Sequence, residues 1–416
     1  MASAVVEAAS PEAHAISVGE SQGDIQPASS LTEGEEKPKS YLYGYEVTLK
    51  SSEKEAKERA YQSTLTSYEE SEDEWQSQKE RIDGILGALS EYGVPISKKD
   101  WNFMKGLCRR GIPFLMRPRA WVAISGATIQ KSIAPQGYEL LKKRTSSLEE
   151  KVKRQIEGDI NRTFPCHPIF QTNEGTECLK NVLSVFALTN PQTGYAQGLN
   201  FVAGMLIIVL GREAEEDVFW TLTCVVNKRM YPETYGEDLK GCHIAQKILN
   251  RLVEKKFPKV FKHFQQLNCE LSFVTSEWLL CLFSRSYPTE TVARVWDSLL
   301  FEGFKIFYRV SLAFLKLHQE GILGCDNIGD LITFVKDEVK AAVNNEQIMR
   351  RAFHGIGSMR SKKIIKYAIQ YEQEVDNMLE MYSEKRKSRA KKPKISEAEA
   401  ASVIQRHYRE YKHNTK

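Results

Sequence analysis

The chain has 416 residues, and its 58 basic and 54 acidic side chains leave a net charge of +4, which is close to balance for this length. That balance excludes the strongly basic surface on which nucleic-acid binding depends, so we expect no nucleic-acid partner. The N-terminus lacks the basic start and apolar core of a secretory signal, and the longest apolar run is too short to span a bilayer, so we expect no transmembrane segment.

Residues 1–40 are rich in Ala, Ser, Glu and Gly and hold few large apolar side chains, which predicts a disordered tail. Residues 41–100 begin with a tyrosine-rich, strand-like segment, for which we expect an arm on the domain surface. Charged, helix-favouring sequence follows, and an apolar stripe that includes Trp75, Ile82 and Leu86 predicts helices that lead into the main domain.

Residues 101–121 indicate two helices separated by a turn. Gly111 is placed to end the first helix, and Pro113 or Pro118 to begin the second, because proline is tolerated in a first helical turn. Arg117 and Trp121 are then one turn apart on the same face. The structural interpretation of this pair is a clamp in which Arg117 lies across a core tryptophan.

A further helix is predicted from about Ser147 through the sequence KVKRQIEGDINRTFP. Ile156, Asp159 and Arg162 follow each other at three-residue steps, so they lie along one side of this helix. Two purely structural explanations account for an arginine at this position. It can pair with the C-terminal helix dipole, or it can form an ion pair with Asp159.

The longest apolar run, residues 199–210, is apolar almost all round, as expected of a helix that is buried on every side. Around its start, Tyr195, Gln197, Gly198 and Asn200 place a phenol and two carboxamides where the helix emerges from a loop rich in turn residues. A rigid element holds such groups still, as a catalytic or phosphate-binding site requires. A core helix with a satisfied polar cap has the same pattern, so both interpretations stay open.

The rest of the main domain has apolar residues at helical spacing, which predicts helix after helix. Gly303 and Gly321 are expected to end two of these helices. Trp278 and Trp296 are expected in the core, and Asp297 is expected to tether two helices rather than to act in catalysis. The eight cysteines contain no CxxC pair, and this indicates reduced thiols, a cytoplasmic protein and no metal site.

Five segments together resemble the TBC domain family, whose members activate Rab-type small GTPases. They are GIPFLMRPRAW, IEGDINRTFP, GYAQGLN, SEWLLCLFSRSYP and ARVWDSLLFEG, in this order along the chain. The similarity covers about residues 107–321 and implies an all-α, multi-helix TBC-like domain over residues 101–325. It also implies a Rab-family small GTPase as the partner. The partner would bind GTP and Mg²⁺, so this chain would need no cofactor, and it has no glycine-rich phosphate loop.

The resemblance implies that Arg162 and Gln197 are two fingers that enter the nucleotide pocket of the GTPase. A planar guanidinium can donate two parallel hydrogen bonds to phosphate oxygens. A carboxamide can accept a proton from the attacking water and donate to a phosphate oxygen at the same time. The supporting residues would orient these two groups and fix the loop, and they are Asp159, Tyr195, Gly198, Asn200 and Arg117.

Residues 326–381 are predicted to continue as two or three amphipathic helices. Residues 382–395 are densely basic, which predicts a solvated linker. A nuclear address or contact with an anionic membrane is the alternative, and the latter would allow peripheral association with endomembranes.

The C-terminal segment, residues 396–412, is predicted to form a basic amphipathic helix that begins with a capping box. Its Ile404, Gln405 and Arg409 resemble the IQ motif, a ligand of calmodulin-type proteins. Glu410 stands where that motif usually has glycine, so a basic helix without a partner is the alternative interpretation. Two other functions stay open: a Rab-binding adaptor that does not accelerate hydrolysis, and a helical platform for the IQ-like segment.

Overall fold

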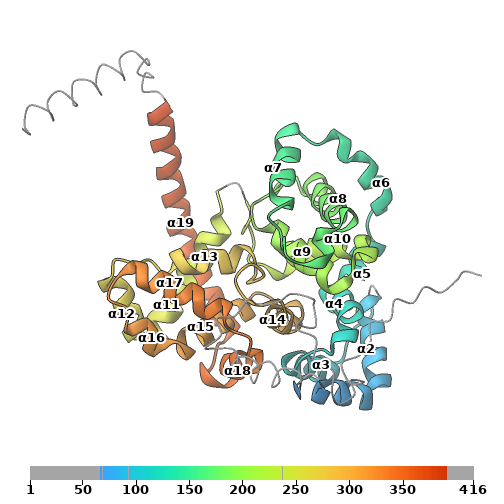
Figure 1. The fold of residues 1–416 in the computed structure, drawn as a ribbon, viewed down its shortest axis with the longest axis horizontal. Helices are drawn as coiled ribbons and strands as arrows, with labels where there is room; N and C mark the ends of the chain where they lie inside the picture. The colour runs from blue at the N-terminus through green and yellow to red at the C-terminus, as the bar shows by residue number, and fades with distance from the viewer. Residues whose placement is uncertain (1–65, 68, 92, 237, 391–416) are drawn as a thin grey trace, which may run out of the picture. The chain divides into compact units, whose positions relative to one another are not determined.

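The computed structural model describes residues 66–67, 69–91, 93–236 and 238–390, all of which belong to one structural unit (Figure 1). These residues form helices and no strand, which confirms the all-α prediction. The predicted tail, the tyrosine-rich arm and the IQ-like helix with Ile404, Gln405 and Arg409 lie outside the described residues.

The first half of the fold begins with a helical stretch at residues 69–77. The α-helices that follow are α2 (Lys79–Ser90), α3 (Lys98–Arg110), α4 (Arg117–Ser125), α5 (Ala127–Ser132), α6 (Tyr138–Lys143), α7 (Glu150–Ile160), α8 (Asn173–Thr189), α9 (Leu199–Leu210) and α10 (Glu215–Cys224). Short 3₁₀ turns occur at Phe114–Met116, Arg144–Ser147, Pro168–Gln171 and Arg212–Ala214, and a π-helical turn at Val225–Arg229.

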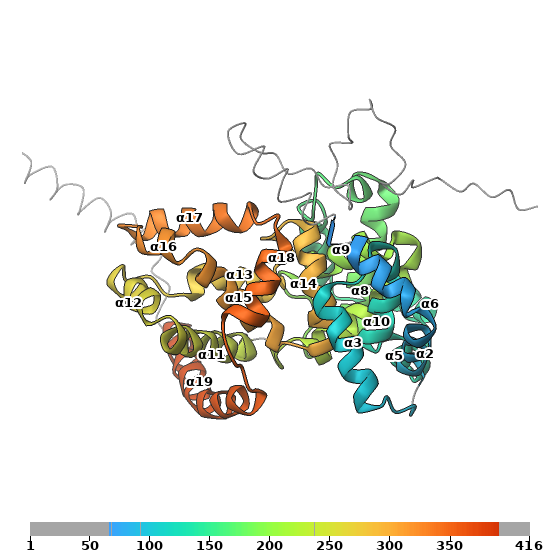
Figure 2. The same ribbon diagram turned by 90° about the horizontal axis from the view of Figure 1, so that it is seen from below.

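The second half is also helical. Its α-helices are α11 (Lys240–Lys256), α12 (Pro258–Gln266), α13 (Ser272–Leu280), α14 (Thr289–Glu302), α15 (Lys305–Leu317), α16 (Gln319–Leu323), α17 (Ile328–Lys340), α18 (Asn345–Arg350) and α19 (Ser361–Ala390), with a π-helical turn at Arg351–Gly355. In both views the helices of the first half lie on one side and those of the second half on the other (Figures 1 and 2). Helix α14 joins them, because it contacts α3 and α4 on one side and α15 and α18 on the other.

Helix α9 is the buried element that the apolar run predicts. Every residue from Leu199 to Leu210 is buried, and the helix packs against α4, α7, α8 and α10. Gly211 ends it with φ of 88°, a backbone conformation that glycine adopts without strain. A helix enclosed on all sides is held rigidly, so its first turn is a fixed platform for the polar groups beside it.

A buried ion pair fastens α4 to α14. Asp297 accepts hydrogen bonds from Arg117 Nε at 3.0 Å and Arg117 Nη2 at 2.9 Å, and also from Trp121 Nε1 and the Ile112 backbone N–H, both at 2.9 Å. Both charged side chains are 0% exposed. Asp297 is therefore a tether, as predicted. Arg117 and Trp121 share this carboxylate, and a fully buried guanidinium cannot reach a partner's nucleotide, so Arg117 is not part of a surface site.

Two local predictions were wrong. Gly303 ends α14 as expected, but Gly321 lies inside α16, where a Cβ would come 2.2 Å from the ring of Phe334. Its role is close packing between helices rather than helix termination. Residues 382–390, predicted as part of a linker, continue α19, because their Lys, Arg, Glu and Ala residues are strong helix formers.

The core confirms the predicted places of the tryptophans and thiols. Trp278 and Trp296 are buried. All eight cysteines are free thiols, and all except Cys166 are buried. None of the described helices is long and apolar enough to cross a membrane.

Candidate functional site

The exit of helix α7 carries the first candidate group. Helix α7 ends at Ile160, so Arg162 lies in the following turn and not in the helix as predicted. The turn is held by Asp159, whose backbone carbonyl accepts from the Arg162 N–H at 3.3 Å and from Thr163 Oγ1 at 2.7 Å. The Asp159 carboxylate also pairs with the guanidinium, at 2.6 Å from Oδ1 to Arg162 Nη2. The ion pair allowed by the three-residue spacing is therefore formed.

Asp159 also joins this turn to the loop before α9. Its other carboxylate oxygen, Oδ2, accepts a hydrogen bond from the Tyr195 hydroxyl at 2.6 Å. Burial raises the pKa of Tyr195 far above its usual value, and the bond to Asp159 raises it further, so the phenol stays a hydrogen-bond donor. One buried carboxylate thus fixes Arg162 and the loop relative to each other.

A second link lies deeper, between Thr163 and Asn200. Asn200 Nδ2 donates to Thr163 Oγ1 at 2.7 Å, and Asn200 Oδ1 accepts from the Gly198 N–H at 3.2 Å. Thr163 and Asn200 are both fully buried, so each of these bonds would be costly to lose. Thr163 was not predicted as a site residue. Its position directly after Arg162, at the end of an amphipathic helix, is the one signal in the sequence.

Gly198 fixes the approach of the loop to the second half of the fold. Its φ of 105° is unfavourable for other residues, and a Cβ would lie 2.9 Å from the carbonyl oxygen of Leu280 at the end of α13. The loop therefore packs directly on the α13 backbone. This close approach explains why glycine stands between Gln197 and the buried helix.

The two predicted fingers differ from their supports in exposure. The Arg162 side chain is 49% exposed, whereas Asp159 and Asn200 are buried. Gln197 is also exposed, and its side chain makes no hydrogen bond within the described part of the chain. A guanidinium and a carboxamide are therefore available at the surface, and the hydrogen-bonded residues Asp159 and Asn200 lie buried beneath them. Arg162 and Tyr195 are joined through Asp159, and Gly198 and Asn200 are joined to the same turn through Thr163. Gln197 lies in the same loop, whereas Arg117 lies apart in the core.

A second guanidinium, Arg285, lies beside this group and was not predicted. Its Nη1 pairs with Glu277 Oε2 at 2.7 Å, and its guanidinium carbon lies 5.3 Å from the ring centroid of Phe201 in the first turn of α9. Burial raises the pKa of the Cys281 thiol to about 12, and the charge of Glu277 also raises it, whereas the charges of Arg285 and Arg162 oppose that rise. Each of the two guanidinium groups is thus paired with a carboxylate, Arg162 with Asp159 and Arg285 with Glu277.

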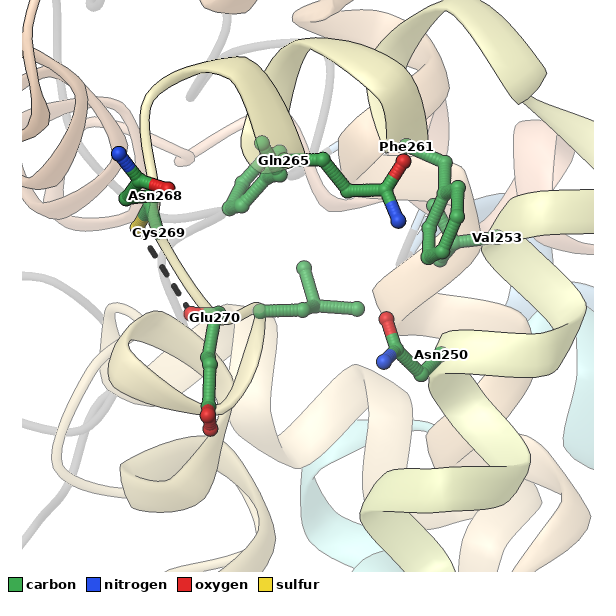
Figure 3. A pocket seen from close by; sticks show the side chains of 9 residues that line it. Asn250, Val253, Phe261, Gln265, Asn268, Cys269 and Glu270 are labelled. Carbon is green, nitrogen blue, oxygen red and sulfur yellow. Dashed lines mark hydrogen bonds between the residues drawn. The ribbon is translucent and has the colours of Figure 1, made fainter.

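A separate cavity lies in the second half of the fold. It has a volume of about 380 Å³ and is lined by residues of α11, α12 and the turn into α13 (Figure 3). The carboxamides of Asn250 and Gln265 face its interior, and none of the predicted site residues lines it. No group of three or more His, Cys, Asp or Glu side chains suited to a metal occurs among the described residues.

Comparison with known proteins gives consistent matches. The family model described as Rab-GTPase-TBC domain matches residues 115–323. Human growth hormone-regulated TBC protein 1 is 34% identical over 282 residues, which are 66% of this chain and 80% of that protein. Human TBC1 domain family member 2A is 34% identical over 263 residues, which are 63% of this chain and 28% of that relative. The match to member 2A therefore spans little more than a quarter of its length.

A solved structure shows the same likeness. The crystal structure of the Chlamydomonas flagellar RabGAP TBC domain superimposes with a TM-score of 0.65 and 30% sequence identity. The superposition covers 77% of this chain and 100% of that domain.

Proposed function

Because the chain belongs to the Rab-GTPase-TBC domain family, we propose that it is a GTPase-activating protein for a Rab-family small GTPase. In this proposal Arg162 and Gln197 act in trans on GTP that the partner binds together with Mg²⁺.

The observation that carries the proposal is the double contact of Asp159. Its two oxygens bind the Arg162 guanidinium and the Tyr195 hydroxyl, both at 2.6 Å, and so place the arginine beside the loop that bears Gln197. An activator needs two exposed side chains that buried, hydrogen-bonded residues hold in place, because the chemistry takes place in another protein's pocket.

Each finger has a defined chemical task. Charge spreads over the terminal phosphate oxygens during phosphoryl transfer, and an arginine supplied by a second protein stabilises it. Asp159 holds Arg162 through one terminal nitrogen, which leaves further N–H donors of the guanidinium for phosphate. Gln197, with its free carboxamide, would orient the attacking water in line with the bond that breaks.

The test of Arg162 is a hydrolysis screen. Purified Rab proteins are loaded with GTP, mixed with the full chain, and followed by release of inorganic phosphate. Arg162→Ala should lower the stimulated rate by about 10³ or more, as expected for a lost arginine finger. Arg154→Ala is the matched control, because Arg154 is exposed on helix α7, which leads into the turn of Arg162, and it should leave the rate unchanged.

Gln197 is tested against a neighbour of the same type. Gln197→Ala should abolish most of the stimulation, whereas Gln192→Ala, also exposed in the loop before α9, should not. Rab binding without accelerated phosphate release by the unmodified chain would contradict the proposal and favour an adaptor. Full stimulation by the Arg162→Ala variant would contradict the role of the finger.

A further inference from the structure

A small cavity lies between the C-terminal end of α11 and the beginning of α19, two helices that pack together in the second half of the fold (Figure 2). Its volume is about 200 Å³. Four cationic residues line it, and no acidic residue does; they are Lys255, Lys256, Arg360 and Lys363. The cavity is remote in sequence from the site described above and shares no residue with it.

The positive charge around this cavity is not neutralised by the protein. None of its four cations forms an ion pair within the described residues. The acidic side chains nearby are engaged elsewhere, since Glu254 pairs with Arg251 and Glu374 with Lys247. An excess of positive charge without a carboxylate partner is what a site for an anion requires.

One of the four cations is fixed by the backbone. Lys256 Nζ donates to the carbonyl oxygens of Ile356 at 2.7 Å and Ser358 at 3.3 Å, and so holds the segment before α19 against the end of α11. Burial lowers the pKa of Lys256, and the charges of Lys363 and Arg309 lower it further. A bound anion would relieve this repulsion between cations.

A buried hydroxyl lies among these ammonium groups. Tyr367 is 6% exposed, and the ammonium groups of Lys255 and Lys363 lie within reach of its hydroxyl. The Nζ atoms of Lys255 and Lys363 lie 5.4 Å and 5.9 Å from the centre of its ring. Burial raises the pKa of Tyr367, but hydrogen bonds from Lys255 and Lys363 and the charges of these two lysines lower it overall. Two cations from different helices therefore converge on one buried phenol.

The start of α19 adds to this potential. The cavity includes Arg360, directly before the helix, and Lys363 in its first turn. The N-terminal end of a helix carries a partial positive charge, and α19 is 30 residues long. Lysine ammonium groups and a helix N-terminus together favour the compact, multiply charged oxygens of phosphate.

We propose that this cavity binds a small anion that carries one or two phosphate groups. A volume of about 200 Å³ is below the roughly 300–1,000 Å³ typical of sites for drug-sized ligands, so the ligand is smaller than a nucleotide. The phosphate can belong to a soluble metabolite or to a lipid headgroup. The exposed Ile365 and Ile369 lie on the opposite face of α19 from Lys363, so an apolar membrane contact there would not face the cavity.

The test uses the full chain and inorganic pyrophosphate at low ionic strength, measured by titration calorimetry. Saturable binding is expected, and Lys255→Gln with Lys363→Gln should weaken it about tenfold or more. The matched control is Lys362→Gln with Lys366→Gln, which removes the same charge from positions of α19 that do not line the cavity and should change the affinity less than about twofold. Arg360→Gln gives a second test at the cavity itself, and circular dichroism checks that each variant folds.

Vesicle flotation separates the two sources of phosphate. Binding only to vesicles that contain phosphatidylinositol bisphosphate, lost in the Lys255/Lys363 variant alone, supports the site with a lipid headgroup as ligand. Equal binding to phosphatidylserine vesicles of the same charge, equal weakening by both double variants, or no saturable binding of either probe overturns the proposal. No GTPase is present in these measurements, so their outcome is independent of the activity proposed above.

Discussion

The tether between α4 and α14 allows a quantitative prediction for Asp297→Asn. Each carboxylate oxygen accepts two hydrogen bonds: Oδ1 from Arg117 Nε and Trp121 Nε1, and Oδ2 from Arg117 Nη2 and the Ile112 N–H. Asparagine has the same shape but presents an NH₂ group in place of one oxygen. In either orientation of the amide, that group faces two donors, so two buried hydrogen bonds are lost.

The cost follows from burial as well as from the lost bonds. Arg117 is 0% exposed, so the substitution leaves a guanidinium without its counter-ion in the core. Removing one member of a buried ion pair typically destabilises a protein by about 3–5 kcal/mol. We expect a loss in this range in the free energy of unfolding, which is a large part of the roughly 5–15 kcal/mol available to a domain.

Urea denaturation of the full chain, followed by tryptophan fluorescence, measures this loss. Asp326→Asn is the control, because Asp326 is exposed, and it should change the free energy by less than about 0.5 kcal/mol. Because Asp297 is a tether and not a catalytic group, the folded fraction of the Asp297→Asn variant should stimulate GTP hydrolysis normally. A destabilisation below about 1 kcal/mol would refute the reasoning.

Three further predictions concern the site and its thiols. Tyr195→Phe removes the 2.6 Å hydrogen bond to Asp159 and should slow stimulated hydrolysis about tenfold in single turnover, with Rab affinity unchanged. An unaltered rate would contradict the proposal that this hydrogen bond positions Arg162 and the loop of Gln197. Gly198→Ala places a Cβ 2.9 Å from the Leu280 oxygen at φ of 105°, so the unfolding free energy should fall by about 1–3 kcal/mol, measured by denaturation. At pH 8 one thiol should react rapidly with an aromatic disulfide reagent, because the other seven are buried. This rapid reaction should be absent in the Cys166→Ser variant. Rapid reaction of several thiols would contradict the burial of the other seven.

The sequence predicted the elements whose signal is local. The apolar run at residues 199–210 predicted a helix buried on every side, and α9 has these bounds because four helices surround it. Gly321 was misassigned because the reason for that glycine is the ring of Phe334 in another helix. The end of α7 was placed too late because Thr163 and Arg162 bond back to the Asp159 carbonyl, and helical spacing does not show where such a turn begins.

The site was predictable as far as the family motifs extend. Asp159, Arg162 and Tyr195 were expected to act together, and they are joined by one carboxylate. Arg117 was placed with them because it belongs to a neighbouring motif. Its partner Asp297 is 180 residues away in the sequence, and no local pattern predicts that contact. Arg285 was missed for a similar reason, since its proximity depends on how α13 meets α9.

The two proposed fingers, Arg162 and Gln197, are not equally ordered before a partner binds. Arg162 is held by Asp159, so much of the rotamer entropy of a long side chain, about 2 kcal/mol, is already lost before binding. Gln197 is exposed and has no such anchor within the described residues, although its loop is fixed on both sides by Tyr195 and Gly198. In the proposed mechanism, the carboxamide would therefore be ordered by the partner. A GTPase that offers the carboxamide no contact would be bound without being activated, so selectivity among Rab proteins can arise at the step of hydrolysis as well as at binding.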